Sequence, residues 1–271
     1  YNVIQKAITS VEELPSLQGS KYLQCKTNKD IFKQIKKELQ FGHKVLYTGM
    51  ACQVEGLKAF LKKEYENLYT IDLICMGIPS YVVWQRYLQT FFNGEKIKSI
   101  NFKEKSVGWD SFSFRVDTDK RVFKEPGMHN LYLRSMFLSW NMRPSCFHCP
   151  FKKAERISDF TLADAWGVYA NTPNINDNKG LSSVIIHSEK GLILWNILKD
   201  QFDCVNVSID DIARGNSNLI SNKPQMGNRK LFYDMLSDNP KNAFELLCSI
   251  KEPSLLQRLK NKVTAVFNKK R

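Results

Sequence analysis

Two consecutive segments of the sequence repeat the same order of a short apolar run, a turn that contains glycine and an amphipathic stretch. The first segment covers residues 44–61 and the second covers residues 68–92. In each, the apolar run has the length of a strand and the later apolar residues recur at helical spacing. Strands that alternate with helices are typical of parallel βαβ units. This alternation constrains the fold most, because it predicts an α/β protein with parallel strands at its centre.

The periodicity changes on either side of these two segments. Residues 28–41 have helical spacing, with Asn28 as N-cap and Gly42 just past the end. From residue 97 to residue 124 the apolar residues alternate with a period of two, which predicts an antiparallel insertion. The predicted fold class is therefore α/β, a mixed sheet with a parallel βαβ core, an antiparallel insertion and a helical C-terminal part. Further predicted elements are a helix near 130–140, a loop over 143–153, strands near 159–166 and 182–187, a long loop over 171–180 and a β-type stretch over 203–207.

Three regions follow from this pattern. Residues 1–95 form a βαβ region, residues 96–250 carry the remaining strands and most of the helices, and residues 251–271 form a tail. The tail has seven basic residues and one acid, and its apolar residues fall along one helical face, so it is predicted to be a basic amphipathic helix. Such helices bind anionic membrane surfaces, although packing on the chain's own domain or on a partner is commoner.

The charge balance favours an acidic partner without naming it. Lys and Arg number 40 against 27 Asp and Glu, a formal net charge of +13, which suits nucleic acid, an anionic membrane, a nucleotide cofactor or an acidic protein. The basic residues are dispersed outside the tail, and the sequence has no nucleic-acid-binding motif, so nucleic acid is the least favoured of these. Hydrolases, P-loop ATPases and ordinary Rossmann dehydrogenases are also disfavoured, because their motifs are missing.

The cellular setting is predicted from the cysteines and the longest apolar run. An odd number of cysteines, seven, in a chain of this length without a secretory leader indicates a reduced, cytoplasmic protein. The longest uncharged apolar run, residues 73–85, is too short and too broken by Gly77 and Pro79 to span a bilayer. Because the sequence begins at Tyr1 without Met, we expect an N-terminal truncation.

Four cysteines are placed where they could share one centre. Cys146 and Cys149 form a C-x-x-C pair in a Pro-bounded loop, while Cys52 and Cys75 each follow a predicted parallel strand. The carboxyl ends of neighbouring parallel strands face one crevice, where α/β proteins collect ligands. Four thiolates suit structural zinc or a 4Fe-4S cluster equally on spacing alone, and strand-end cysteines are often simply small buried apolar residues.

The other three cysteines have no such placement. Cys204 and Cys248 lie in apolar patterns and are predicted to be buried core residues, whereas Cys25 stays ambiguous.

Seven sequence blocks, which together reach over nearly the whole chain, resemble the beta subunit family of coenzyme F-420 hydrogenases and dehydrogenases. The resemblance implies an iron–sulfur flavoprotein whose C-terminal domain corresponds to residues 96–250. It implies one 4Fe-4S cluster beside FAD, and electron relay between a redox partner and a hydride-accepting small molecule. By block matching, the cluster ligands fall on Cys52, Cys75, Cys146 and Cys149. The blocks are GSKY at 19–22, TGMACQV at 48–54, GLK at 56–58, IDLICMGIPS at 71–80, RPSCFHC at 143–149, SDFTLADAWG at 158–167 and DNKGLS at 177–182.

The sequence also departs from the family's pattern. Ala51 stands where a Pro is usual, Met76 where a His is common, Cys25 where a serine is common, and Ala163 begins a block that usually reads Gly-Asp-Phe-Trp. These departures leave the cluster ligands in place but leave the substrate open, including whether coenzyme F-420 is used at all. Many members carry an N-terminal ferredoxin-like domain, so the redox partner is either such a domain or a separate protein.

Seven residues are candidates for holding the flavin. Lysines near backbone N–H groups bind phosphate well, which makes the loops around Lys21 and Lys179 candidates for binding the flavin phosphate. Without the resemblance, both residues are better explained as ordinary loop lysines. Asp164 and Trp166 end a predicted strand and could flank the flavin, while Trp166 could equally be a core aromatic. The leading alternative for the whole chain is a zinc-stabilised, non-enzymatic binding protein. The candidate flavin residues are Ser20, Lys21, Tyr22, Asp164, Trp166, Lys179 and Gly180.

Overall fold

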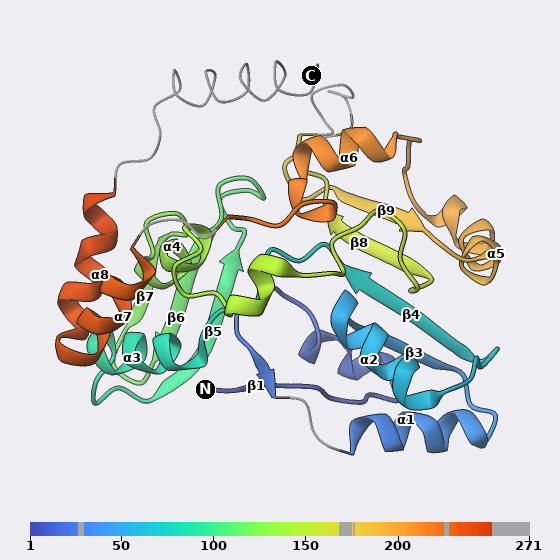
Figure 1. Cartoon of the computed structure of the whole chain (residues 1–271), viewed down its shortest axis with the longest axis horizontal. Helices are drawn as coiled ribbons and strands as arrows, with labels where there is room; N and C mark the ends of the chain where they lie inside the picture. The colour runs from blue at the N-terminus through green and yellow to red at the C-terminus, as the bar shows by residue number, and fades with distance from the viewer. Residues whose placement is uncertain (27–29, 168–174, 176, 225–227, 251–271) are drawn as a thin grey trace.

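The computed structural model describes residues 1–26, 30–167, 175, 177–224 and 228–250. It is a mixed α/β protein with two larger sheets on opposite sides of the molecule, which confirms the predicted fold class (Figure 1). A small parallel pair, β1 (Val3–Ile4) and β2 (Cys25–Lys26), lies near the N-terminus. The predicted cap Asn28, half of the predicted loop 171–180 and the predicted tail helix 251–271 lie outside the described residues.

The four-stranded sheet has the order β3-β4-β8-β9. Strands β3 (Val45–Met50) and β4 (Leu68–Leu73) are parallel, as are β4 and β8 (Phe160–Asp164), whereas β9 (Ser182–Ile186) runs antiparallel to β8. The predicted parallel core is thus present, and it takes its third strand from a segment far along the chain. Helices α1 (Ile31–Gln40) and α2 (Ala51–Leu61) pack on this sheet through a shared apolar cluster. The buried members of that cluster are Ile35, Leu39, Tyr47, Val54, Leu57, Leu61 and Leu68.

The chain between β4 and β8 builds the second sheet, which confirms the antiparallel insertion. Its strands are β5 (Ile97–Glu104), β6 (Ser113–Thr118) and β7 (Val122–Pro126), paired antiparallel in that order. Four helices share its aromatic core, namely α3 (Tyr81–Phe91), α4 (Leu131–Phe137), α7 (Arg229–Asp238) and α8 (Pro240–Ser249), and all four lie around this sheet (Figure 1). The largest fully buried rings of this core are Trp84, Phe102, Phe114, Tyr132, Phe232 and Phe244.

Helices α5 (Glu189–Leu198) and α6 (Ile209–Gly215) complete the four-stranded side, with α6 packed through Ile212 and Ala213 against Ile185. Between them, the predicted β-type stretch 203–207 is wrong, because those residues form no strand. Their side chains are exposed, including Val205 at 49%, so pairing there would bury no apolar face.

The prediction that Cys204 and Cys248 are buried is also wrong, since both are exposed. Cys204 lies in the same exposed stretch, and the buried face of α8 consists of Ala243, Phe244 and Leu247, which leaves Cys248 toward solvent.

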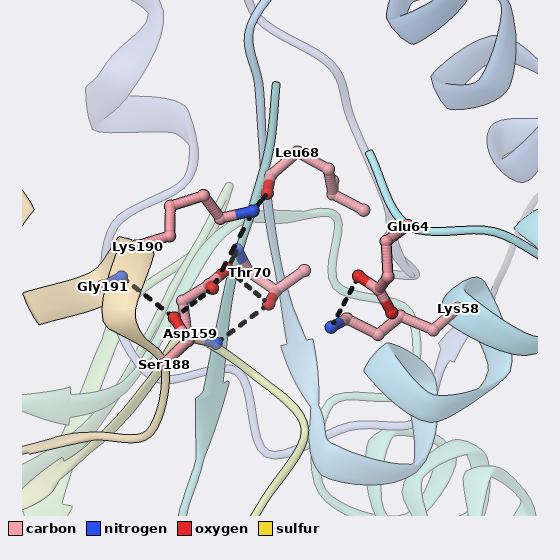
Figure 2. A network of polar contacts seen from close by, with 8 residues as sticks. All are labelled: Lys58, Glu64, Leu68, Thr70, Asp159, Ser188, Lys190 and Gly191. Atoms are coloured by element: carbon pink, nitrogen blue, oxygen red, sulfur yellow. Dashed lines mark hydrogen bonds and ion pairs between the residues drawn. The ribbon is translucent and has the colours of Figure 1, made fainter. Parts of the chain in front are cut away.

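Asp159 ties β4, the start of β8 and the N-terminus of α5 together (Figure 2). Its Oδ2 accepts hydrogen bonds from the Thr70 backbone N–H at 2.7 Å and the Thr70 hydroxyl at 2.9 Å. Its Oδ1 accepts from the Ser188 hydroxyl at 2.6 Å, and that hydroxyl also caps α5 by accepting from the Gly191 N–H at 2.9 Å. Lys190 donates to the Leu68 carbonyl and completes the set. This network fixes β8 beside β4.

None of the helices formed by the described residues combines the length and the apolar composition that crossing a membrane requires.

Candidate functional site

Cys52 and Cys75 follow neighbouring strands at the same edge of the four-stranded sheet. Met50, the last residue of β3, lies opposite Leu73, the last residue of β4. Cys52 lies in the first turn of α2. There Gln53 Oε1 accepts a hydrogen bond from the Met50 backbone N–H at 2.8 Å, which stabilises the turn. Cys75 comes two residues after β4. Both thiols therefore lie at the carboxyl edge of the parallel sheet, where the sequence predicted them.

The C-x-x-C loop is joined to the Cys75 loop by backbone contacts. The Ser80 N–H donates to the Asn141 carbonyl at 2.7 Å, and the Arg143 N–H donates to the Ile78 carbonyl at 2.8 Å. Cys146 and Cys149 then follow in and after the 3-10 helix η2 (Pro144–His148). These paired segments bring the C-x-x-C loop to the sheet edge that carries the other two cysteines.

The four thiols are electrostatic neighbours in a partly buried region. Burial raises the pKa of Cys75 to about 11, and the nearby Cys146 and Cys52 act in the same direction. Burial also raises the pKa of Cys52, followed by the influence of Cys149 and Cys146, while Arg143 opposes the shift. A metal or cluster would therefore have to displace the thiol protons that this environment otherwise retains.

As they stand, the thiols are not gathered around a single point. Across the described ranges, no group of three or more His, Cys, Asp or Glu side chains is close enough to hold one metal ion. All seven cysteines are free thiols. The site is thus a loose set of four thiols contributed by three loops.

A second group of polar and aromatic side chains surrounds Asp164 at the end of β8. Lys103 of β5, whose side chain is only 4% exposed, forms an ion pair with the Asp164 carboxylate. The Trp109 indole N–H donates to Asp164 Oδ1 at 3.3 Å. The Trp109 and Trp166 rings stack with centroids 4.4 Å apart and planes 11° from parallel, and the Lys103 ammonium lies 5.1 Å from the Trp166 ring centroid. A buried cation, a carboxylate and a flat aromatic face thus meet between the two larger sheets.

Some of the predicted flavin residues reach this Asp164 group. Burial raises the pKa of Tyr22, and the nearby Asp164 carboxylate adds to the shift, while a hydrogen bond from Ser20 opposes it. A Cβ atom on Gly180 would lie 3.6 Å from Trp109 Cδ1, so the loop at Gly180 passes beside the indole.

The two predicted phosphate-binding lysines do not reach it. The Lys21 ammonium donates to the carbonyls of its own loop, those of Leu17, Gln18 and Gly19, at 3.2, 2.6 and 3.2 Å. Lys179 is 87% exposed at its side chain and lies 3.6 Å from the Asp177 carboxylate. Neither ammonium is directed toward Asp164.

Lys103 and Trp109 were missed by the sequence analysis. Lys103 lies in an alternating strand pattern that does not distinguish a buried lysine from an exposed one. Trp109 lies in a predicted turn, where a large aromatic residue after Gly108 was the one available signal. Its burial comes from the loop of Asn178, whose backbone carbonyl accepts from the Trp109 N–H at 2.9 Å.

Comparison with protein families identifies the relationship. Residues 42–210 match the family that is described as the C terminus of the coenzyme F420 hydrogenase/dehydrogenase beta subunit. The chain belongs to this family. The matched region includes all four candidate cluster cysteines and the Asp164 group except Tyr22 and Ser20, and it ends before α7 and α8.

Among solved structures, the chain is similar to one in the F420-reducing NiFe hydrogenase complex of Methanosarcina barkeri, studied as a xenon derivative. The identity is 20%, the match covers 85% of this chain and 70% of that chain, and the TM-score is 0.44. No curated protein matches the sequence.

Proposed function

We propose that this chain is an iron–sulfur flavoprotein module that relays electrons between a redox protein and a hydride-accepting small molecule. The observation that carries the proposal is the placement of Cys52, Cys75, Cys146 and Cys149 on three loops at one sheet edge, within the region that matches the family. One-electron transfer at a cluster and hydride transfer at a flavin are the chemistry that such groups supply when bound. The redox partner is a separate protein or a ferredoxin-like domain.

The family match favours a cluster over a single zinc ion. Residues 42–210 match a family described by its hydrogenase/dehydrogenase chemistry. Zn²⁺ has no redox chemistry, whereas an iron–sulfur cluster held by four thiolates transfers electrons. The match therefore supports the 4Fe-4S assignment over the zinc-stabilised binding protein.

The residues around Asp164 suit a flavin. The half-buried Trp166, stacked on the fully buried Trp109, offers a flat aromatic surface, and the Lys103 and Asp164 charges can orient the polar edge of a bound ring. Tyr22 and Gly180 complete this site, which makes Lys103 an additional cofactor-binding candidate and Trp109 the ring that positions Trp166. Lys21 and Lys179 are left as weaker candidates, because their ammonium groups already contact their own loops.

The experiment is anaerobic preparation of the chain with iron and sulfide, followed by absorption spectra and analysis for iron, sulfide and zinc. We expect about four irons and four sulfides per chain and the broad visible absorption of a cluster. FAD titration of the same preparation tests the flavin site, with Trp109→Ala expected to weaken binding. Trp195→Ala, which removes a ring stacked on the exposed Phe202 at 6.0 Å, is the matched control. Zinc without iron or sulfide would contradict the proposal.

A further inference from the structure

Lys152 lies beside the cysteine site without a carboxylate partner, and Lys223 lies near Lys152. The Lys152 ammonium is 3.4 Å from the Met76 carbonyl oxygen and 3.1 Å from Asn218 Oδ1, and both of these groups are neutral. Lys223 is half-buried like Lys152. Within the part of the chain that the structure describes, neither lysine forms a salt bridge. This is unusual, because charged groups removed from water are normally paired.

One short segment after α6 holds both the cation and the C-x-x-C loop. Asn222 Oδ1 accepts from the Cys149 N–H at 3.1 Å, and its Nδ2 donates to the Cys149 carbonyl at 3.4 Å. Asn218, four residues earlier, holds Lys152, which also contacts the residue after Cys75 through the Met76 carbonyl. The ammonium of Lys152 is therefore fixed between the two loops that carry Cys75 and Cys149.

The electrostatics of this arrangement favour an anion beside Lys152. Burial lowers the pKa of Lys152, while Cys75, Cys149 and Cys146 oppose that shift in their ionised forms. Burial also lowers the pKa of Lys223, and the positive charge of Lys152 adds to the effect. Two partly desolvated cations near each other repel unless an anion lies close to both. A centre ligated by four thiolates is such an anion.

We propose that Lys152 is the counter-charge of the iron–sulfur centre and raises its reduction potential, with Asn218 as its positioning residue. This inference rests on the proposed function. When the centre accepts one electron its negative charge increases, so a cation held nearby stabilises the reduced form more than the oxidised form. Removing the cation must therefore make the centre harder to reduce.

The experiment is a redox titration of the reconstituted full chain, with dithionite as reductant and the reduced cluster measured by EPR. At a potential equal to the wild-type midpoint, Lys152→Met should lower the ratio of reduced to oxidised cluster about tenfold. This corresponds to a midpoint potential that is lower by about 59 mV for one electron. Lys152→Arg keeps the charge and should stay within about twofold of wild type. Asn218→Ala should give part of the Lys152→Met shift.

Lys153→Met is the matched control, because Lys153 is the exposed neighbour in the same loop and its loss changes the net charge equally. It should leave the midpoint unchanged. If Lys152→Met and Lys153→Met give the same midpoint, or if Lys152→Arg shifts as far as Lys152→Met, the inference is wrong while the cluster itself stands. If Lys152→Met fails to assemble a cluster, an unshifted midpoint in Asn218→Ala overturns the inference. A wild-type chain that assembles no cluster overturns both this inference and the proposed function.

Discussion

Gly77 and Met142 approach so closely that a Cβ atom on Gly77 would lie 2.5 Å from the Met142 sulfur. The same atom would lie 3.3 Å from Cys146 Cβ, and the φ angle of Gly77 is +142°, a conformation that side chains rarely adopt. Gly77 therefore lets the Cys75 loop and the C-x-x-C loop come into contact, and the geometry of the cysteine site depends on it.

We predict that Gly77→Ala separates these two loops. The added methyl group clashes with Met142 and strains the backbone, so the free energy of unfolding should fall by about 1–3 kcal/mol. Iron content after reconstitution should fall with it. The matched control is Gly56→Ala in α2, where the new Cβ would lie 3.8 Å from Phe32, an ordinary contact. There the free energy of unfolding should rise by about 0.5–1 kcal/mol, with iron unchanged. Full iron content in Gly77→Ala would argue against this dependence.

Loss of one candidate ligand should be distinguishable from loss of an exposed cysteine. Cys146→Ala is expected to abolish the cluster and to loosen the surrounding loops, because a closed metal site contributes folding free energy that the apo chain lacks. Cys204→Ala and Cys248→Ala change exposed thiols and should leave iron content at the wild-type level. Iron and sulfide analysis of the three variants, with limited proteolysis of each, measures both effects. Equal iron loss in all three would show that the four ligands are wrongly assigned.

The ion pair between Arg156 and Asp72 should be important for stability. Their side chains are 3% and 1% exposed, and Arg156 Nη1 lies 2.8 Å from Asp72 Oδ1. Arg156→Met leaves the Asp72 carboxylate buried without a counter-charge, hydrogen-bonded to the neutral Ser158 and Thr161 hydroxyls, so we expect it to lower the free energy of unfolding by about 3–5 kcal/mol. Urea unfolding followed by circular dichroism measures this change. Lys230→Met, which breaks an exposed pair with Asp234, should give no measurable change. A similar result for both variants would be inconsistent with this prediction.

His187 should make stability fall in mild acid. Burial lowers its pKa from the ordinary value of 6.5, although the nearby Asp72 carboxylate opposes the shift. As the pH falls below 6.5, the unfolded chain takes up a proton that folded His187 does not, so the unfolded state gains stability. This penalty is absent above the unfolded pKa and grows as the pH falls toward the folded pKa. Urea unfolding at about pH 7.5 and about pH 5.5 should therefore show a smaller loss for His187→Gln than for wild type. Equal losses would refute the prediction.

Local sequence was enough to predict most of the secondary structure and one chemical motif. The repeated order in residues 44–61 and 68–92 predicted β3 with α2 and β4 with α3, because burying one face of a strand or helix imposes a period that local sequence records. The same reasoning predicted the antiparallel strands within 97–124. It also placed Cys52 and Cys75 at strand ends, because the end of each apolar run and the turn that follows it are visible in the local sequence.

The sequence patterns did not indicate which distant segments lie next to one another, and only the tertiary structure shows this. Strand β8 pairs with β4 after a whole second sheet has intervened, and no periodicity in 159–166 indicates that neighbour. The same holds for Lys103 beside Asp164 and for Lys152 beside the cysteines, where a lysine that reads as a surface residue is desolvated by other parts of the chain. The periodicity of apolar residues indicates which face of a helix or strand is buried. The free energy of a charged side chain depends instead on which groups surround it once water is removed. Those groups are assembled by long-range packing, and so the cationic setting of the cysteine site became visible only in the tertiary structure.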